Sequence, residues 1–412
     1  MKRHPLLQAW IVVGLLWVVA ALNYLDRVML TTMRGSLVDA IPMTEAQFGL
    51  LTSVFLWVYA ILSPVTGYLA DRFSRSRVII ISLLFWSAFT WLTGHAKTFE
   101  QLLAIRALMG VSEATYIPAA LALISDYHRS GTRSLATGIH MTGVSAGQAL
   151  GGLGGSLAEQ HTWNYPFLLF GAIGIVFAVL LFGILRDAPR EGGTAPAAGS
   201  GQPEEKAAFG EALRSLLSQR QFYFMLGYWG LLGMVGWAVV GWVPTYLQEH
   251  FNLSQSKAGW LATVPLQIAM ALGLLTGGAW ADRWSRTNPH ARFLVPIIGL
   301  GVAAPAVFLL SQTSVLTLAI VGLIGYGFGR TFTDSNMMPV LCLVADPRYR
   351  ATGYGLLNFC SCTIGGLSNL AGGMLRDAHV NVSLLFLCSS VSMLVCAALM
   401  AGVKPARRVT VG

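Results

Sequence analysis

The sequence predicts an all-α integral membrane protein, with twelve transmembrane helices in two pseudo-symmetric six-helix bundles. Two observations lead to this prediction: apolar stretches fill nearly the whole chain, and one charged motif occurs twice, half a chain apart. The 412 residues are 55% hydrophobic and only 11% charged, whereas a soluble domain has roughly 25% charged residues. Because such a chain cannot cover itself with a polar surface in water, we expect it to lie in a bilayer.

The apolar stretches have the length of membrane spans, since most reach the roughly 20 residues that a helix needs to cross the hydrocarbon. Their glycines and prolines are tolerable in bilayer helices that pack closely against neighbours. No stretch remains for a soluble catalytic domain, so no enzyme is expected. The predicted spans are 8–31, 46–69, 78–96, 101–125, 134–158, 164–185, 222–247, 258–281, 293–311, 315–344, 351–374 and 381–402.

The repeated motif is a charged turn between two apolar stretches. Its copies share glycine, aspartate and arginine at identical spacing, and they comprise Gly67, Asp71, Arg72 and Arg75 in the first half and Gly278, Asp282, Arg283 and Arg286 in the second. This recurrence predicts a duplicated and fused bundle. Parallel halves with a binding site at their interface are one architecture of secondary transporters.

The predicted halves are separated by one long polar segment. The N-terminal bundle covers 1–186, the linker 187–220 and the C-terminal bundle 221–412. The linker is rich in Gly, Pro and Ser, a flexible composition. Within it, residues 204–214 could form a short amphipathic helix at the membrane surface.

Positive charge predicts the orientation. If the N-terminus is cytoplasmic, nearly all Lys and Arg outside the spans lie on that side, and the opposite side holds only Arg34, Lys97, Lys257 and Arg376. By the positive-inside rule both termini are cytoplasmic, in a bacterial-type inner membrane. The net charge of +9 is then explained by contact with anionic lipid, without nucleic acid.

The first apolar stretch is too long for the core of a cleavable signal peptide.

The charged turns would lie on the cytoplasmic side, and we expect them to form a cytoplasmic gate. Asp71 can accept hydrogen bonds from an opposing helix N-terminus, which favours an anion, and the arginines can close onto carboxylates. Contacts of this kind across the halves would stabilise the outward-open state. The alternative is a basic loop that only sets topology.

The motif Gly-x-x-x-Asp-Arg-x-x-Arg resembles the signature loop of the major facilitator superfamily, and here it occurs in both halves. Counted by spans and loop order, the resemblance covers essentially the whole chain. It implies two six-helix bundles around a central cavity that opens alternately to either side.

Ionisable residues inside predicted spans cost several kcal/mol and usually face a cavity or a partner. Asp26 and Arg27 are adjacent, so they point about 100° apart and cannot both serve one partner. The other four are Arg106, Glu113, Arg330 and Asp334, of which the last two can pair within one helix. They could be ion pairs that only fix packing. However, three acids balance three bases, so protonating one acid leaves the cavity positive and couples proton entry to anion entry.

The segments Asn23-Tyr24-Leu25-Asp26-Arg27 and Arg106-Ala-Leu-Met-Gly-Val-Ser-Glu113 resemble the anion:cation symporter branch of the superfamily. This branch includes galactonate, glucarate and hexuronate carriers. The resemblance implies a proton-coupled symporter of a small organic anion, a sugar acid or related carboxylate. It makes Asp26 and Glu113 the proton-relay acids, with Arg106 tuning Glu113, and it assigns the substrate carboxylate to Arg27. The expected substrate set is Tyr24, Arg27, Tyr116, Trp242, Tyr246, Arg330, Asp334 and Asn358.

Two departures from that branch leave the substrate open. Arg330 and Asp334 do not belong to its usual pattern, and Val144 stands where sugar-acid carriers often have glutamine, with Gln148 one turn further on. Asn23–Arg27 and Glu113-Ala-Thr-Tyr116 also resemble spinster-type lipid transporters. The alternatives are therefore a carrier of a lysolipid or other amphiphile, a proton-driven drug exporter, and a receptor with this fold.

The sequence lacks the motifs that several other functional classes require. The chain has no Gly-x4-Gly-Lys-Ser/Thr phosphate loop, which excludes an ATP-driven pump of that type. The five cysteines lie in predicted spans without paired spacing, so neither a disulfide framework nor a metal site is expected. We expect no cofactor, and the partners are a small-molecule substrate, protons and membrane lipid. The protein is expected to be a monomer.

Overall fold

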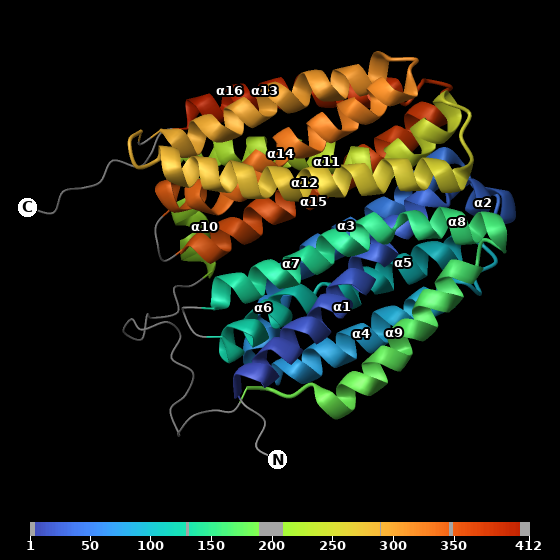
Figure 1. Cartoon of the computed structure of the whole chain (residues 1–412), viewed down its shortest axis with the longest axis horizontal. Helices are drawn as coiled ribbons and strands as arrows, with labels where there is room; N and C mark the ends of the chain where they lie inside the picture. Colours follow the sequence, from blue (N-terminus) through green and yellow to red (C-terminus); the bar gives the residue numbers. More distant parts are fainter. Residues whose placement is uncertain (1–4, 129–131, 189–208, 289, 346–348, 404–412) are drawn as a thin grey trace, which may run out of the picture.

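The computed structural model describes residues 5–128, 132–188, 209–288, 290–345 and 349–403, without the side chains at 5–6, 63–72, 134, 209, 212 and 351. All regular structure in this part is helical (Figure 1). The N-terminal half contains α1 Pro5–Thr32, α2 Arg34–Ala40, α3 Glu45–Arg72, α4 Arg75–Thr93, α5 Phe99–Glu113, α6 Tyr116–Tyr127, α7 Arg133–Leu150, α8 Gly152–Gln160 and α9 Tyr165–Ile184. The C-terminal half contains α10 Phe209–Leu217, α11 Arg220–His250, α12 Gln255–Trp284, α13 Ala291–Gln312, α14 Leu316–Val344, α15 Arg350–Asp377 and α16 Ser383–Gly402.

Ten helical stretches of the described chain are long and apolar enough to cross a membrane. They correspond to ten of the twelve predicted spans, with α5 and α6 forming one of them. The remaining two predictions, 134–158 and 351–374, correspond to the more polar α7–α8 and α15, which pack against the others. The predicted all-helical membrane fold is therefore confirmed. Of the expected amphipathic helix at 204–214, residues 204–208 lie outside the described part, and α10 covers Phe209–Leu217.

Local sequence accounts for several helix boundaries. Ser74, Thr98 and Ser254 precede α4, α5 and α12, and each hydroxyl accepts a hydrogen bond from the backbone N–H three residues further on. Such N-caps satisfy amides that have no partner within the helix. Between α7 and α8, the chain bends at Gly151, where a Cβ would lie 2.4 Å from Val28 Cγ1. The bend therefore depends on a residue without a side chain.

Helices α1 and α7 pack at backbone distance because Gly147 has no side chain. A Cβ at this position would lie 2.2 Å from the carbonyl oxygen of Ala21. We expect Gly147→Ala to destabilise the N-terminal half by about 1–3 kcal/mol, the usual cost of overpacking, measured as a lower melting temperature in detergent. Gly138→Ala in the same helix is the control, since nothing lies within 4 Å of its Cβ position. Equal melting temperatures for the two variants would contradict this packing argument.

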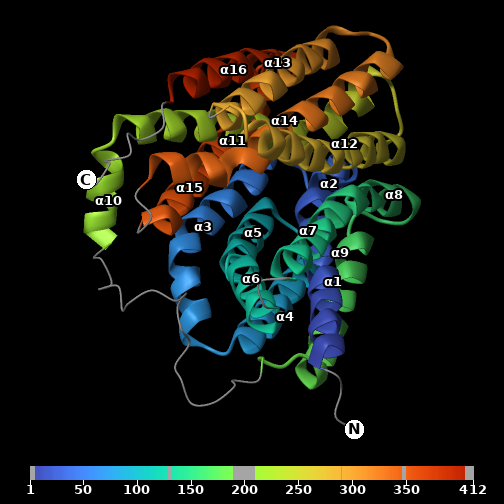
Figure 2. The same cartoon turned by 60° about the vertical axis from the view of Figure 1, so that its left-hand side comes forward.

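The two halves meet most extensively along α3 and α15, and also where α8 and α7 pack against α12. Ser53 Oγ donates to the carbonyl oxygen of Gly366 at 2.6 Å, and Trp57 Nε1 donates to that of Thr363 at 3.1 Å. The bundles converge toward the end that carries α2 and α8, here called the α2 end, and diverge toward the end that carries α10, the α10 end (Figures 1 and 2).

Candidate functional site

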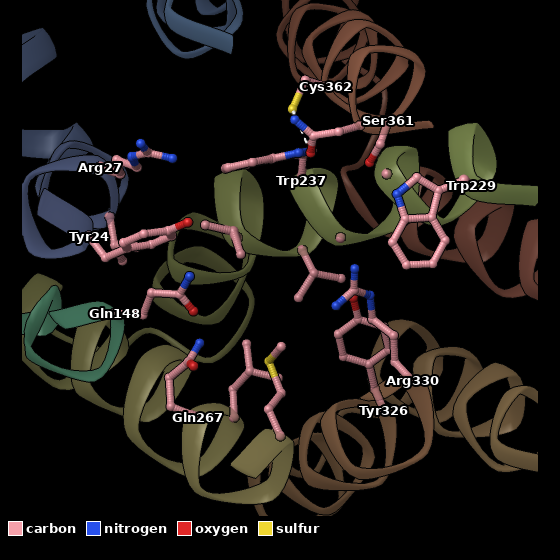
Figure 3. A pocket seen from close by; sticks show the side chains of 18 residues that line it. Tyr24, Arg27, Gln148, Trp229, Trp237, Gln267, Tyr326, Arg330, Ser361 and Cys362 are labelled. Atoms are coloured by element: carbon pink, nitrogen blue, oxygen red, sulfur yellow. Dashed lines mark hydrogen bonds between the residues drawn. The ribbon is translucent and has the colours of Figure 1, made fainter. Parts of the chain in front are cut away.

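A central cavity of about 220 Å³ lies between the halves, and both contribute to its lining (Figure 3). The N-terminal half contributes from α1 and α7, and the C-terminal half from α11, α12, α14 and α15. The polar side chains of the lining include two arginines and three amides. The residues with the largest or most polar side chains are Tyr24, Arg27, Gln148, Trp229, Trp237, Gln267, Tyr326, Arg330, Asn358, Ser361 and Cys362.

Arg27 belongs both to this cavity and to a buried ion pair. Its Nε donates to Oε2 of Glu113 at 2.8 Å, and the two side chains are 5% and 0% exposed. Its guanidinium lies 4.5 Å from the ring centre of Tyr24 and 4.7 Å from that of Tyr59, positions that favour a cation. Nη2 of Arg27 has no partner among the described residues. The guanidinium therefore has donor capacity beyond the pair with Glu113.

Asp26 is buried beside Arg27 but has a different partner. Its Oδ2 accepts a hydrogen bond from the Thr90 hydroxyl at 3.0 Å, and it lies outside the cavity lining. The adjacent positions thus point apart, as the 100° turn per residue requires. The buried polar group is stabilised by one hydrogen bond in the described part, and Oδ1 has no partner there.

Arg106 is buried beside Phe55 and the backbone of α3. Its guanidinium lies 4.9 Å from the ring centre of Phe55, and Nε is 3.5 Å from the carbonyl oxygen of Leu51. Within the described chain no carboxylate is within ion-pair distance of Arg106. Glu113 pairs instead with Arg27, which α1 brings to it from elsewhere in the sequence.

Arg330 and Asp334 pair within α14, as their spacing predicts. Nη1 of Arg330 donates to Oδ2 of Asp334 at 3.0 Å. Arg330 lines the cavity and Asp334 does not. Tyr326, one turn before Arg330, also lines the cavity. The C-terminal half thus presents one guanidinium to the cavity.

Four residues of the expected substrate set lie outside the lining of this cavity: Asp334, described above, and the aromatic residues Tyr116, Trp242 and Tyr246. Each aromatic residue uses its polar group within its own half: Tyr116 donates to the carbonyl oxygen of Leu16 at 2.8 Å, Trp242 to that of Asn369 at 3.2 Å and Tyr246 to that of Leu310 at 3.0 Å. All three are almost fully buried. Buried Tyr and Trp usually need such a partner, and the aromatic pattern alone does not distinguish packing from ligand contact. Tyr24, Arg27, Arg330 and Asn358 do line the cavity.

Several lining residues were not predicted from the sequence to belong to the site. Gln148 and Gln267 belong to α7 and α12 and approach the cavity from different halves (Figure 3). Three further aromatic residues of the lining are Trp229, Trp237 and Tyr326. An amide within an apolar span is a signal that could have indicated the two glutamines. The aromatic residues have no such signal, because they also occur throughout the packed core.

A four-residue ion network, formed by Arg34, Glu45, Glu249 and Arg376, joins the halves at the α2 end. Arg34 pairs with Glu45 within the N-terminal half and lies 3.4 Å from Glu249 of the C-terminal half. Arg376 pairs with Glu249 at 2.6 Å and with Glu45 at 3.1 Å. Each half thus contributes one acid and one base. From the sequence, the two arginines were interpreted only as charges that set the topology.

Further contacts close the same end. Asp377 accepts hydrogen bonds from the backbone N–H groups of Glu45 and Ala46 at 2.8 and 2.9 Å, which satisfies the N-terminus of α3. Between α8 and α12, the hydroxyls of Ser156 and Ser256 are 2.6 Å apart. In the described chain, the side-chain hydrogen bonds and ion pairs between the halves lie between the cavity and this end. The cavity is therefore closed toward the α2 end.

The charged turns lie at the α10 end, and their described side chains connect helices of the same half. Arg75 pairs with Asp126, and Asp282 accepts from Arg292 at 2.8 Å. Arg283 and Arg286 are exposed, and Gly278 is partly exposed. The side chains at Gly67, Asp71 and Arg72 lie outside the described part. The predicted contact across the halves remains a prediction for the state in which this end closes.

Asp187 strengthens the turn of the N-terminal half. Its Oδ1 accepts a hydrogen bond from the backbone N–H of Ser76 at 2.8 Å. Partial burial would raise the pKa of Asp187, but hydrogen bonds from Ser74 and Ser76 outweigh burial and hold that pKa below its usual value. Asp187 thus connects the end of the N-terminal bundle to the start of α4.

Two helical bundles around a polar cavity, closed at one end, define a membrane transporter in which the bundles move against each other. The family model of the Major Facilitator Superfamily matches residues 16–369. The chain belongs to this superfamily and is an integral, multi-pass membrane protein. The predicted superfamily is thereby confirmed.

Similar proteins fall into two groups. The chain is 26% identical to the "Probable galactarate/D-glucarate transporter GarP" of Escherichia coli K12, over 96% of this chain and 95% of that protein. It is also 26% identical to "Protein spinster homolog 1" of Xenopus tropicalis, over 86% of this chain and 70% of that protein. A crystal structure of a bacterial homolog of the human lysosomal transporter Spinster, inward-facing and occupied, matches with a TM-score of 0.81 at 23% identity, covering 98% and 97% of the two chains. This structural likeness shows the fold alone.

Proposed function

We propose that the protein is a proton-coupled symporter of a small organic anion, a sugar acid or related carboxylate, working by alternating access. One observation carries this proposal: Arg27 lines the cavity and at the same time pairs with buried Glu113. One guanidinium can therefore interact with a ligand carboxylate and with a titratable acid.

The coupling follows from charge. With Glu113 ionised, the guanidinium of Arg27 is neutralised, and a ligand anion gains little from it. A proton on Glu113 leaves the cation available for a two-bond contact with a carboxylate. Asp26, buried one residue away and hydrogen-bonded to Thr90, is proposed as the second acid of the proton path. Arg106, without a carboxylate partner in the described chain, offsets negative charge at these acids.

The volume and the polar lining of the cavity favour a small polar ligand over a lipid. Its volume of about 220 Å³ is below the roughly 300–1,000 Å³ typical of pockets for drug-sized ligands. The amides of Gln148, Gln267 and Asn358 offer donors and acceptors to hydroxyl groups. The galactarate/D-glucarate relative supports the same ligand class. The spinster-type relative keeps a lysolipid or other amphiphile as the second candidate.

We assign the α10 end to the cytoplasm, because the basic turns and loops lie there and the positive-inside rule applies. Both termini are then cytoplasmic, and this conformation is inward-facing. In the outward-open state the charged turns close the cytoplasmic end, with Asp71 and Asp282 as the central acids of the gate. We place the protein in an inner membrane as a monomer, bound by lipid and without a cofactor.

Uptake into proteoliposomes tests the proposal. An inward proton gradient is expected to drive accumulation of hexonates or hexarates above their external concentration, and collapse of the gradient with a protonophore is expected to prevent it. Lysophosphatidylcholine and a cationic dye serve as the lipid and drug substrates. Transport of only one of these two compounds, with no movement of any sugar acid, would replace the proposed function by the corresponding alternative.

A further inference from the structure

Two guanidiniums from different halves line the same cavity. Arg27 lies on α1 and Arg330 on α14, and Figure 3 places them on different sides of the pocket. The carboxylate partner of each, Glu113 or Asp334, lies outside the lining. The cavity is thus lined by two separate guanidiniums, and each is paired with a carboxylate that lies outside the lining.

Both guanidiniums retain unused donors. Arg330 contacts Asp334 through Nη1, and its Nε is buried without a partner among the described residues. The same holds for Nη2 of Arg27. Each guanidinium thus contacts its acid through one nitrogen and has capacity for a further acceptor in the cavity.

The backbone of α11 leaves room for Arg330 at Gly236. A Cβ at this position would lie 3.1 Å from Nη2 and 3.4 Å from Cζ of Arg330. An alanine methyl group there would require the guanidinium to shift by a few tenths of an ångström, and Gly236 itself lines the cavity. The position of Arg330 therefore depends on a residue of another helix.

We propose that the ligand carries two carboxylates and bridges the halves, with one carboxylate on Arg27 and the other on Arg330. This inference rests on the proposed function and specifies its substrate class as a small hydroxylated dicarboxylic acid. Each guanidinium can hold a carboxylate in a planar two-bond contact. The amides of Gln148, Gln267 and Asn358 border the same space and bind hydroxyl groups on the carbon chain between the two acids.

Calorimetry with the purified protein and two matched ligands tests the inference. Galactonate and galactarate differ in one terminal group, which is an alcohol in the first and a carboxylate in the second. The wild-type protein is expected to bind galactarate at least 10-fold more tightly. In Arg330→Gln/Asp334→Asn, which removes the cation together with its acid, galactarate affinity is expected to fall to the galactonate level, so that the variant no longer distinguishes the two acids.

A second pair of variants keeps the test independent of that ion pair. Gly236→Ala crowds Arg330 and is expected to weaken galactarate binding several-fold more than galactonate binding. The control is Gly227→Ala in the same helix, where the Cβ would have an ordinary contact of 3.5 Å with Leu399. It is expected to change neither affinity.

The outcomes separate the two proposals. Equal wild-type affinity for both acids, or an equal loss for both in the double and Gly236 variants, would overturn the bridging arrangement and leave an organic-anion carrier. Absence of binding and transport for every organic acid would instead defeat the proposed function, and the bridging arrangement with it.

Discussion

Glu113→Gln is expected to abolish proton-driven accumulation of the substrate while retaining exchange of substrate across the membrane. Glutamine keeps an oxygen that can accept from Nε of Arg27, 2.8 Å away in the native pair, but it cannot release or take up a proton. The variant therefore resembles the protonated state, in which the guanidinium is available to the anion. We expect uphill uptake in proteoliposomes to fall at least 100-fold and counterflow to stay within a few-fold of the wild type.

Asp26→Asn is expected to give the same pattern, because the amide can still accept from the Thr90 hydroxyl. The matched control is Asp39→Asn, which neutralises an exposed acid on α2 and is expected to behave like the wild type. Continued accumulation under a proton gradient in both buried-acid variants would show that coupling does not depend on these residues.

Arg376→Gln is expected to open the α2 end. Arg376 pairs with Glu45 and Glu249 from different halves, so the substitution removes one of the cations that hold the halves together there. Hydrogen bonds to charged groups contribute about 1.5–3 kcal/mol each when partly buried, and solvent reduces this for Glu249, whose side chain is 47% exposed. A net loss of about 3 kcal/mol would shift the balance toward the outward-open state roughly 100-fold.

Spin labels at Lys97 and Ser314, exposed loop positions of the two halves at this end, can report the shift as a longer distance in pulsed dipolar spectra. Lys257→Gln removes an exposed cation of the C-terminal half and serves as the charge-matched control. If Arg376→Gln leaves the distance distribution as it is in the wild type, the four-residue ion network does not control closure.

The sequence predicted what depends on composition and local spacing. Length and hydropathy defined the spans, and the four-residue interval between Arg330 and Asp334 predicted their pair. The sequence pattern could not predict ion pairs between helices that are distant in the sequence. Arg27 reaches Glu113 because α1 packs beside the junction of α5 and α6, and no pattern in either helix specifies that contact.

The same limit explains why some residues of the expected substrate set lie outside the cavity lining. The Trp242–Tyr246 face is apolar with polar tips, a pattern that serves a ligand or a neighbouring backbone carbonyl equally well. The structure shows carbonyl partners for both. The network at the α2 end was missed because its acids, Glu45 and Glu249, lie in different halves and have no repeat that relates them. Glu45 lies on α3 and Glu249 on α11, and both reach Arg376 because α15 packs against both helices.

The shared guanidinium of Arg27 has a thermodynamic consequence in the proposed mechanism. If a proton on Glu113 strengthens anion binding by a given factor, the bound anion must strengthen proton binding by the same factor, since both describe one closed cycle of equilibria. Anion binding at constant pH must then take up protons from the solution. The number taken up, measured by titration in buffers of different ionisation enthalpy, must equal the slope of log affinity against decreasing pH.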